Sequence, residues 1–220
     1  MRVVSATVFV DRRGEQTGVR DQGDRPTCSA FAVTAGHEWL CRDLPDLSEE
    51  FALWAAKARD GLGGEATTIA AALSGAIDEG QALEGDWPYG TPAYPAPPPL
   101  IARDRLRRRQ PNSWRSLDGS LDRLREAIIQ GRQAVVLRLA FAPRAWAYST
   151  RGWVDAAGSE AAVGNHAVLA IGLRPPDTTR PWSVIVKNSW GAGWGDAGFG
   201  YISETYMRRY PWQAYGLDAK

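Results

Sequence analysis

The segment Val186-Lys-Asn188-Ser-Trp190-Gly-Ala-Gly-Trp194-Gly195 is the longest and most specific motif of the chain. The apolar residues 182–186 predict a strand that ends just before Asn188, and the glycines that follow predict a turn. Three glycines between 193 and 198 have the spacing Gly-x-Gly-x-x-Gly, which also occurs in dinucleotide-binding loops. Because no helical pattern follows them, we interpret this segment as a glycine-rich turn and not as a dinucleotide site.

Two more segments carry residues suited to chemistry. Gly164-Asn-His166-Ala-Val168 stands at the start of an apolar run over residues 167–173, which predicts a second strand. Far upstream, Val19-Arg-Asp-Gln22-Gly-Asp-Arg-Pro-Thr-Cys28-Ser-Ala-Phe-Ala32 leads from a turn into an apolar stretch that extends to residue 40. That stretch predicts a buried helix, with Thr27 as its cap and Cys28 in its first turn.

A thiol, an imidazole and an amide in this order suit nucleophilic catalysis. A thiolate is the reactive form of cysteine, and both the partial positive charge of a helix N-terminus and a nearby imidazolium favour it. The imidazole needs a group that fixes its orientation, and the side-chain oxygen of Asn188 is a candidate. The oxyanion that develops during acyl transfer needs donors, for which the Gln22 side chain and the Cys28 backbone N–H are candidates.

The three segments resemble, in the same order, the motifs of the papain-like cysteine peptidases. His166 lies 138 residues and Asn188 160 residues after Cys28. The family spacing is roughly 130–150 residues, so an insertion near residues 174–181 would explain the late Asn188. The resemblance implies four catalytic roles: Cys28 as nucleophile, His166 as general base and acid, Asn188 as its orienter, and Gln22 in the oxyanion hole.

The resemblance also implies substrate-binding residues. Gly61-Leu-Gly-Gly64 is similar to the glycine pair that lines the family's cleft, so we expect Gly63 and Gly64 to bind the main chain of an extended substrate. We expect Asn165 to add a carbonyl contact and Trp190 to form part of the cleft wall.

The chain departs from the family pattern beside the nucleophile. Arg25-Pro26-Thr27 stands where the family usually has Cys-Gly-Ser, and Ser29 stands where it usually has Trp. The lost tryptophan removes one wall of the cleft. We expect Trp190 and residues 142–153, which include several aromatic side chains, to replace it.

The order of the remaining patterns predicts an α+β protein of two lobes. Further helices are expected from Ser48, over 67–78 and over 121–130, and further strands over 134–140 and 200–202. Residues 91–98 are rich in proline and mark the boundary between the lobes. The resemblance implies a single papain-like catalytic domain over 1–220. In it a helical lobe (about 20–100) faces a barrel-like, β-rich lobe (about 101–220 with the N-terminal strand), and the active site lies in the cleft between them.

Composition limits the other classes of function. A net charge of +1 gives no field that favours nucleic acid, and no apolar run is long enough to span a membrane. Two histidines and two cysteines make a zinc site difficult to assemble, so we expect no metal and no cofactor.

If Cys28 and Cys41 lie on one helix, they are too far apart to form a disulfide. A chain without disulfides fits a reducing compartment, and we expect it in the cytoplasm. The preference for arginine over lysine suggests a bacterial source.

These observations favour a thiol protease that acts on a peptide or protein substrate through a Cys28 thioester. Two alternatives stay open: a catalytically silent, peptide-binding pseudopeptidase, and an acyl-transferase or amidase on the same scaffold. The segment around Asp11 resembles the start of a mature enzyme, so we expect no inhibitory pro-segment. Control is then expected from elsewhere, for example from a dedicated partner or regulator protein.

Overall fold

The computed structural model describes residues 8–41, 46–96, 98–101, 105–106, 110–117, 119–147, 149–156 and 158–219. Its helices are α1 (Cys28–Leu40), α2 (Glu49–Asp60), α3 (Ile69–Glu79), α5 (Leu121–Gln130), α6 (Pro143–Ala147) and α7 (Glu204–Arg209). Short 3-10 turns occupy Arg13–Glu15 and Thr150–Gly152. Its strands are β1 (Val10–Asp11), β2 (Ser113–Leu117), β3 (Gln133–Phe141), β4 (Trp153–Val154), β5 (Gly164–Arg174), β6 (Ser183–Lys187), β7 (Phe199–Ser203) and β8 (Trp212–Asp218).

Local capping sets the ends of the helices below the sheet. The Ser48 hydroxyl accepts a hydrogen bond from the Phe51 amide at the start of α2, and Thr68 does the same for α3. Gly80 follows α3 with a φ of 79°, a conformation that glycine adopts without strain. The starts of α1 and α2 and the stop after α3 are therefore where the sequence predicts them.

The strands form one mixed sheet in the order β2-β8-β3-β5-β6-β7-β4, with β1 paired to β5. Neighbouring strands are antiparallel except β4 and β7, which run parallel. The sequence predicts β3, β5, β6 and β7. It does not predict β8, which lies between β2 and β3, or β2 at the edge beside β8.

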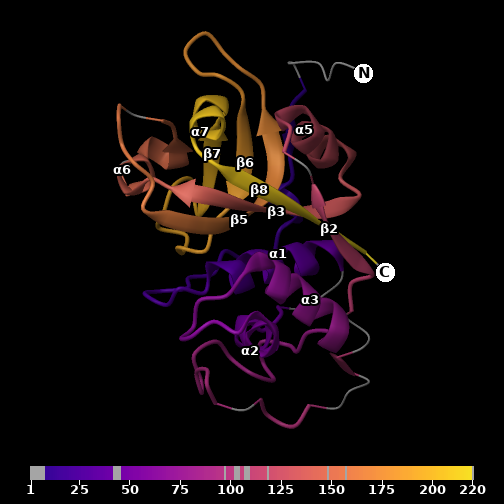
Figure 1. The fold of residues 1–220 in the computed structure, drawn as a ribbon. Helices are drawn as coiled ribbons and strands as arrows, with labels where there is room; N and C mark the ends of the chain where they lie inside the picture. The colour runs from indigo at the N-terminus through magenta and orange to yellow at the C-terminus, as the bar shows by residue number, and fades with distance from the viewer. Residues whose placement is uncertain are drawn as a thin grey trace.

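Each face of the sheet has its own core. On one face, Val135, Leu137 and Val168 pack with residues of α5 and α7. On the other, Val136 and Leu169 pack with Val33 of α1. Figure 1 shows α1 directly below the sheet, with α2 and α3 beneath it and α5, α6 and α7 above. The α+β two-lobed architecture is as expected, with α1 at the boundary between the lobes.

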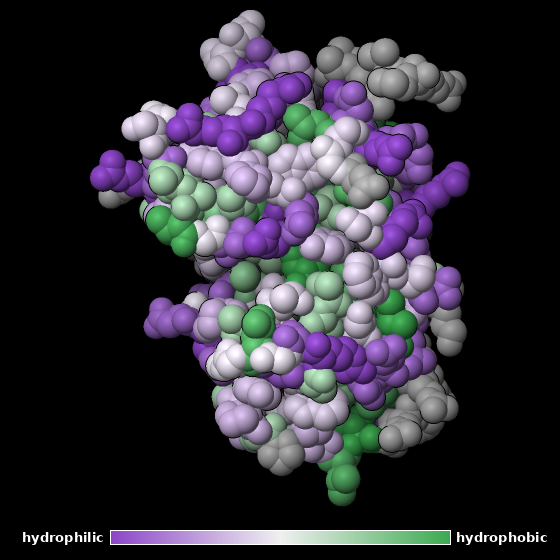
Figure 2. Space-filling view, in the orientation of Figure 1, coloured by the Kyte–Doolittle hydropathy of each residue, from purple (hydrophilic) through white to green (hydrophobic). Residues whose placement is uncertain are grey.

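The face seen in Figure 2 is mixed. Hydrophobic side chains are visible at mid-height, where the sheet meets the helices, and also near the lower end, among hydrophilic side chains. Among the described residues, no helix is both long enough and apolar enough to cross a bilayer.

Candidate active site

Cys28 is the first residue of α1, and its backbone N–H therefore has no partner within the helix. Thr27 occupies the N-cap position as predicted, but its side chain does not cap the helix. The Thr27 hydroxyl lies 2.7 Å from the Tyr89 hydroxyl instead. The dipole and the free amide at the start of α1 therefore remain directed at the region around the Cys28 thiol.

His166 and Asn188 come from neighbouring strands. His166 lies near the start of β5 and Asn188 directly follows β6, and the two strands pair antiparallel. The His166 Nε2 atom is 2.7 Å from Asn188 Oδ1, which also accepts the Ser189 amide at 2.9 Å. Because the amide oxygen only accepts, Nε2 carries the proton and Nδ1 is left as the basic nitrogen.

Aromatic rings enclose the imidazole. Trp190 stacks on His166 at a centroid distance of 4.6 Å, and Trp146 meets it edge-on at 5.1 Å. Trp194 in turn stacks on Trp146. These rings exclude water from the His166–Asn188 hydrogen bond and strengthen it. The expectation that residues 142–153 replace the missing cleft wall is wrong for Trp146, which is fully buried against the imidazole, and Tyr148 lies outside the described residues.

The Gln22 amide is held at both ends. Its Oε1 accepts a hydrogen bond from the Ser189 hydroxyl at 2.6 Å, and its Nε2 donates to the Arg25 carbonyl at 2.7 Å. The Gln22 backbone N–H donates to the Ser189 carbonyl as well. A primary amide has two N–H donors, so one of them is left for an oxyanion.

Burial favours the uncharged forms of the thiol and the imidazole. It raises the pKa of Cys28, although the backbone amides of Ala167 and Ser29 oppose the shift. Burial also lowers the pKa of His166 to about 4, and the hydrogen bond to Asn188 opposes it only in part. Neither charge is stable alone in this site. A proton passed from Cys28 to His166 creates both charges together, so that each compensates the other.

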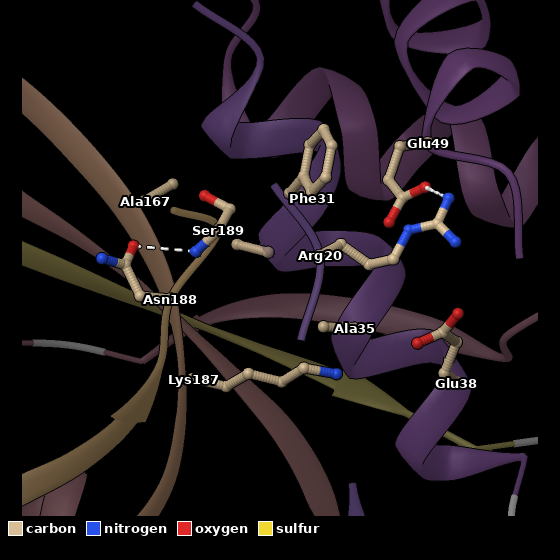
Figure 3. Close-up of a pocket in the computed structure, with 10 residues that line it drawn as sticks. Arg20, Phe31, Ala35, Glu38, Glu49, Ala167, Lys187, Asn188 and Ser189 are labelled. Atoms are coloured by element: carbon tan, nitrogen blue, oxygen red, sulfur yellow. Dashed lines mark hydrogen bonds and ion pairs between the residues drawn. The ribbon is translucent and has the colours of Figure 1, made fainter. Parts of the chain in front are cut away.

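A charged network supports the segment that carries Asn188. Figure 3 shows Lys187 extending from the strand below Asn188 toward Glu38 of α1. The Lys187 ammonium donates to the Thr17 carbonyl at 3.0 Å and to its hydroxyl at 2.8 Å, and that hydroxyl donates to Glu38. These side chains tie β6 to α1, the two elements that position the catalytic groups.

The same view shows Arg20, from the segment before α1, beside Glu49 at the start of α2. Arg20 donates to Glu49 at 3.3 Å, and burial raises the pKa of Glu49 to about 8 although Arg20 opposes this. Sequence reasoning did not identify these support residues. The sequence does carry an indication for Lys187, since it is one of only three lysines and directly precedes Asn188.

A cleft of about 520 Å³ opens between the lobes at this point. Cys28 and Ser29 line one side of it, and Asn165, His166 and Ala167 line the other. The structure thus places the thiol and the imidazole of the sequence motifs in one cleft. The side chain of Ser29, where the family usually has a tryptophan, donates to the Thr67 carbonyl at 3.0 Å and is nearly buried, so it projects little into the cleft.

The expected substrate-binding residues fall into two groups. Asn165 lines the cleft, whereas Trp190 lies behind the imidazole and is not part of the lining. Gly63 and Gly64 are exposed in the loop between α2 and α3, and a Cβ atom at either would meet nothing within 4 Å. That loop continues into Ala66 and the threonines that do line the cleft.

Comparison with known proteins agrees with this geometry. The family model of the papain family cysteine protease matches residues 7–212. Chicken (Gallus gallus) cathepsin K is 29% identical over 205 residues, which cover 88% of this chain and 57% of cathepsin K. The chain thus spans little more than half the length of this relative. It belongs to the papain family of cysteine proteases.

Solved structures show the same fold. Xylellain, a cysteine protease from Xylella fastidiosa, superimposes with a TM-score of 0.81 at 18% identity, and the match covers 96% of this chain and 86% of xylellain. A Carica candamarcensis cysteine protease, solved in complex with E-64, superimposes with a TM-score of 0.71 at 21% identity, with 96% and 99% covered. The papain-like fold is thereby confirmed.

Proposed function

We propose that this chain hydrolyses peptide bonds by covalent catalysis at Cys28. The observation that supports this best is the placement of Cys28, at the start of α1, in one cleft with His166, whose imidazole is oriented by Asn188. A mere peptide-binding module would need the cleft but not an imidazole enclosed by aromatic rings and fixed in one tautomer.

The first half of the reaction forms a thioester. His166 Nδ1 takes the thiol proton, and the Cys28 sulfur attacks the carbonyl carbon of the substrate. The resulting oxyanion accepts hydrogen bonds from the Cys28 backbone N–H and the remaining Gln22 N–H. When the C–N bond breaks, the imidazolium gives its proton to the leaving amine.

The second half returns the enzyme to its starting state. His166 takes a proton from water, and the hydroxide attacks the thioester carbonyl. The C–S bond breaks, the carboxylic acid product leaves and the proton returns to the Cys28 sulfur. Asn188 keeps the imidazole in one orientation through both halves of the reaction, because its side-chain oxygen accepts the hydrogen bond from Nε2–H.

The test is incubation of the chain with an unbiased peptide library, followed by mass spectrometry of the products. Hydrolysis yields pairs of fragments whose masses sum to the parent plus one water, whereas acyl transfer to another peptide yields longer, ligated products. Cys28→Ala should fold normally and give no products. Unchanged peptides with the wild-type chain, or equal cleavage by Cys28→Ala, would contradict the proposal.

A further inference from the structure

The cleft contains a charged residue that the catalytic mechanism does not use. Along β3, alternate residues point to the same face of the sheet. Ala134 and Val136 face α1, since both lie close to Gly36 of that helix. Arg138 is the next residue on this face, and in register it lies between Ala167 of β5 and Gln213 of β8. It therefore stands where this face of the sheet leaves the cover of α1 and enters the cleft, which Arg138 lines together with Cys28 and His166.

The guanidinium of Arg138 has no carboxylate partner among the described residues. Its hydrogen bond within the described chain is a long one, 3.4 Å, to the amide oxygen of Gln213. Among the residues that the structure describes, those that line the cleft include no aspartate or glutamate. Glu65, which precedes the lining residue Ala66, is already bound by Arg25 at 2.6 Å. Within the described part of the chain, the cleft therefore presents a positive charge without a carboxylate beside it.

We propose that Arg138 makes this site selective for substrates with an aspartate or glutamate side chain near the scissile bond. This inference rests on the proposed peptidase function and names its substrate class. A guanidinium binds a carboxylate through two parallel hydrogen bonds, and the partly enclosed cleft strengthens such a pair. Ile69, although nearly buried, adds an apolar edge to the same lining. Lysine or arginine at the same substrate position is repelled.

Cleavage of matched peptides tests this selectivity. The peptides carry blocked ends, so that no terminal carboxylate is present, and each pair differs only by Glu against Gln at one position flanking the scissile bond. At one of the tested positions, the kcat/KM of the Glu peptide should be about tenfold higher than that of the Gln peptide. This is the lower end of the range for a hydrogen bond to a charged group. Arg138→Gln should abolish the difference, Arg138→Lys should retain part of it, and Arg138→Glu should shift the preference to Lys peptides.

Arg123 provides the matched control, since it is exposed on α5, which packs on the face of the sheet opposite α1. Arg123→Gln removes the same charge and should keep the Glu preference in full. Equal cleavage of Glu and Gln peptides at every position, or an unchanged preference in Arg138→Gln, would overturn the inference while the peptidase function stands.

A binding measurement tests the recognition of acidic side chains separately from peptide cleavage. With Cys28→Ala, fluorescence anisotropy of the labelled peptide pairs reports recognition without cleavage. The Glu peptide should bind about tenfold more tightly, and the difference should vanish when Arg138→Gln is added. If the wild-type chain cleaves nothing but this difference is present, the proposed reaction fails and the recognition holds. Equal affinities, or no binding of either peptide, overturn the inference.

Discussion

The Nε2 atom of His166 lies 2.7 Å from the Oδ1 atom of Asn188, and this contact decides which ring nitrogen is left for Cys28. An amide oxygen cannot donate, so the imidazole is fixed with its proton on Nε2 and its lone pair on Nδ1. Trp190 and Trp146 pack on the ring and oppose its rotation. Orientation of the base thus has two sources, one polar and one apolar.

Because the aromatic rings keep part of this orientation, Asn188→Ala should reduce kcat/KM less than His166→Ala does. We expect a loss of roughly 10- to 100-fold, the equivalent of one hydrogen bond to a group that becomes charged. Loss of the base itself should cost roughly 10²–10⁴-fold. Steady-state kinetics on one peptide substrate measures both. Equal losses would mean that Asn188 does more than orient the imidazole.

Gln22→Ala should lower kcat by about 10²–10³, the range for one lost oxyanion donor. The matched control is Ser189→Ala, which removes the hydroxyl bound to Gln22 Oε1 but leaves the donor in place. This variant should keep most of the activity. If kcat is unchanged in Gln22→Ala, Gln22 does not belong to the site. If both variants lose activity equally, Gln22 acts only by holding the loop.

Cys28 should be the thiol that iodoacetamide modifies fastest near neutral pH, with Cys41 as the internal reference. Burial raises the pKa of Cys28, so rapid reaction requires His166 to accept the proton. In His166→Ala the rate at Cys28 should fall well below the wild-type rate, while the rate at Cys41 stays the same. Peptide mapping by mass spectrometry over time gives both rates. A Cys28 rate that does not respond to His166 would contradict the proton transfer.

The elements that the sequence predicts well are those with local signals. Ser48 begins α2 and Gly80 ends α3, because capping and a positive φ depend only on neighbouring residues. Strand β8 mixes polar and apolar residues without a clear period, and it is stabilised by β3, which lies far away in the sequence. Its pairing could not be read from its own residues.

The site shows the same limit. The motifs indicate Cys28, His166 and Asn188 because their spacing is specific. They do not indicate that Trp146 lies behind the imidazole and not along the cleft, since its burial depends on β5 and on the tryptophans of a distant turn. Arg138 sits in an apolar strand pattern, and only the register with β5 and β8 places it in the cleft.

The buried imidazole should also make stability depend on pH. Its pKa falls from 6.5 to about 4 on folding, so between these values the unfolded chain binds the proton and the folded chain does not. Stability therefore falls as the pH decreases from about 6.5 to about 4, by at most roughly 3 kcal/mol from this residue.

Urea unfolding at pH 7 and pH 4 measures this effect, with Cys28→Ala in every chain to prevent self-cleavage. Adding His166→Gln removes the titrating group, so the loss of unfolding free energy between the two pH values should be smaller in that variant. Other groups titrate equally in both chains and cancel in the comparison. An identical loss would mean that His166 keeps an ordinary pKa in the folded state.

The loop that carries Gly63 and Gly64 is expected to bind the substrate main chain, and bulk at this loop should block peptides but not small reagents. Gly64 has a φ of 65°, so a side chain there would strain the backbone whatever the substrate does. Gly63 has open space around it and no positive φ, which makes Gly63→Val the cleaner test.

In Gly63→Val we expect KM for peptides to rise about tenfold or more, the equivalent of one or two lost main-chain hydrogen bonds, while iodoacetamide modifies Cys28 at the wild-type rate. Gly85→Val is the control, since Gly85 is also exposed and open but lies in a different loop, after α3. If Gly63→Val cleaves peptides as the wild type does, the substrate runs along another part of the cleft.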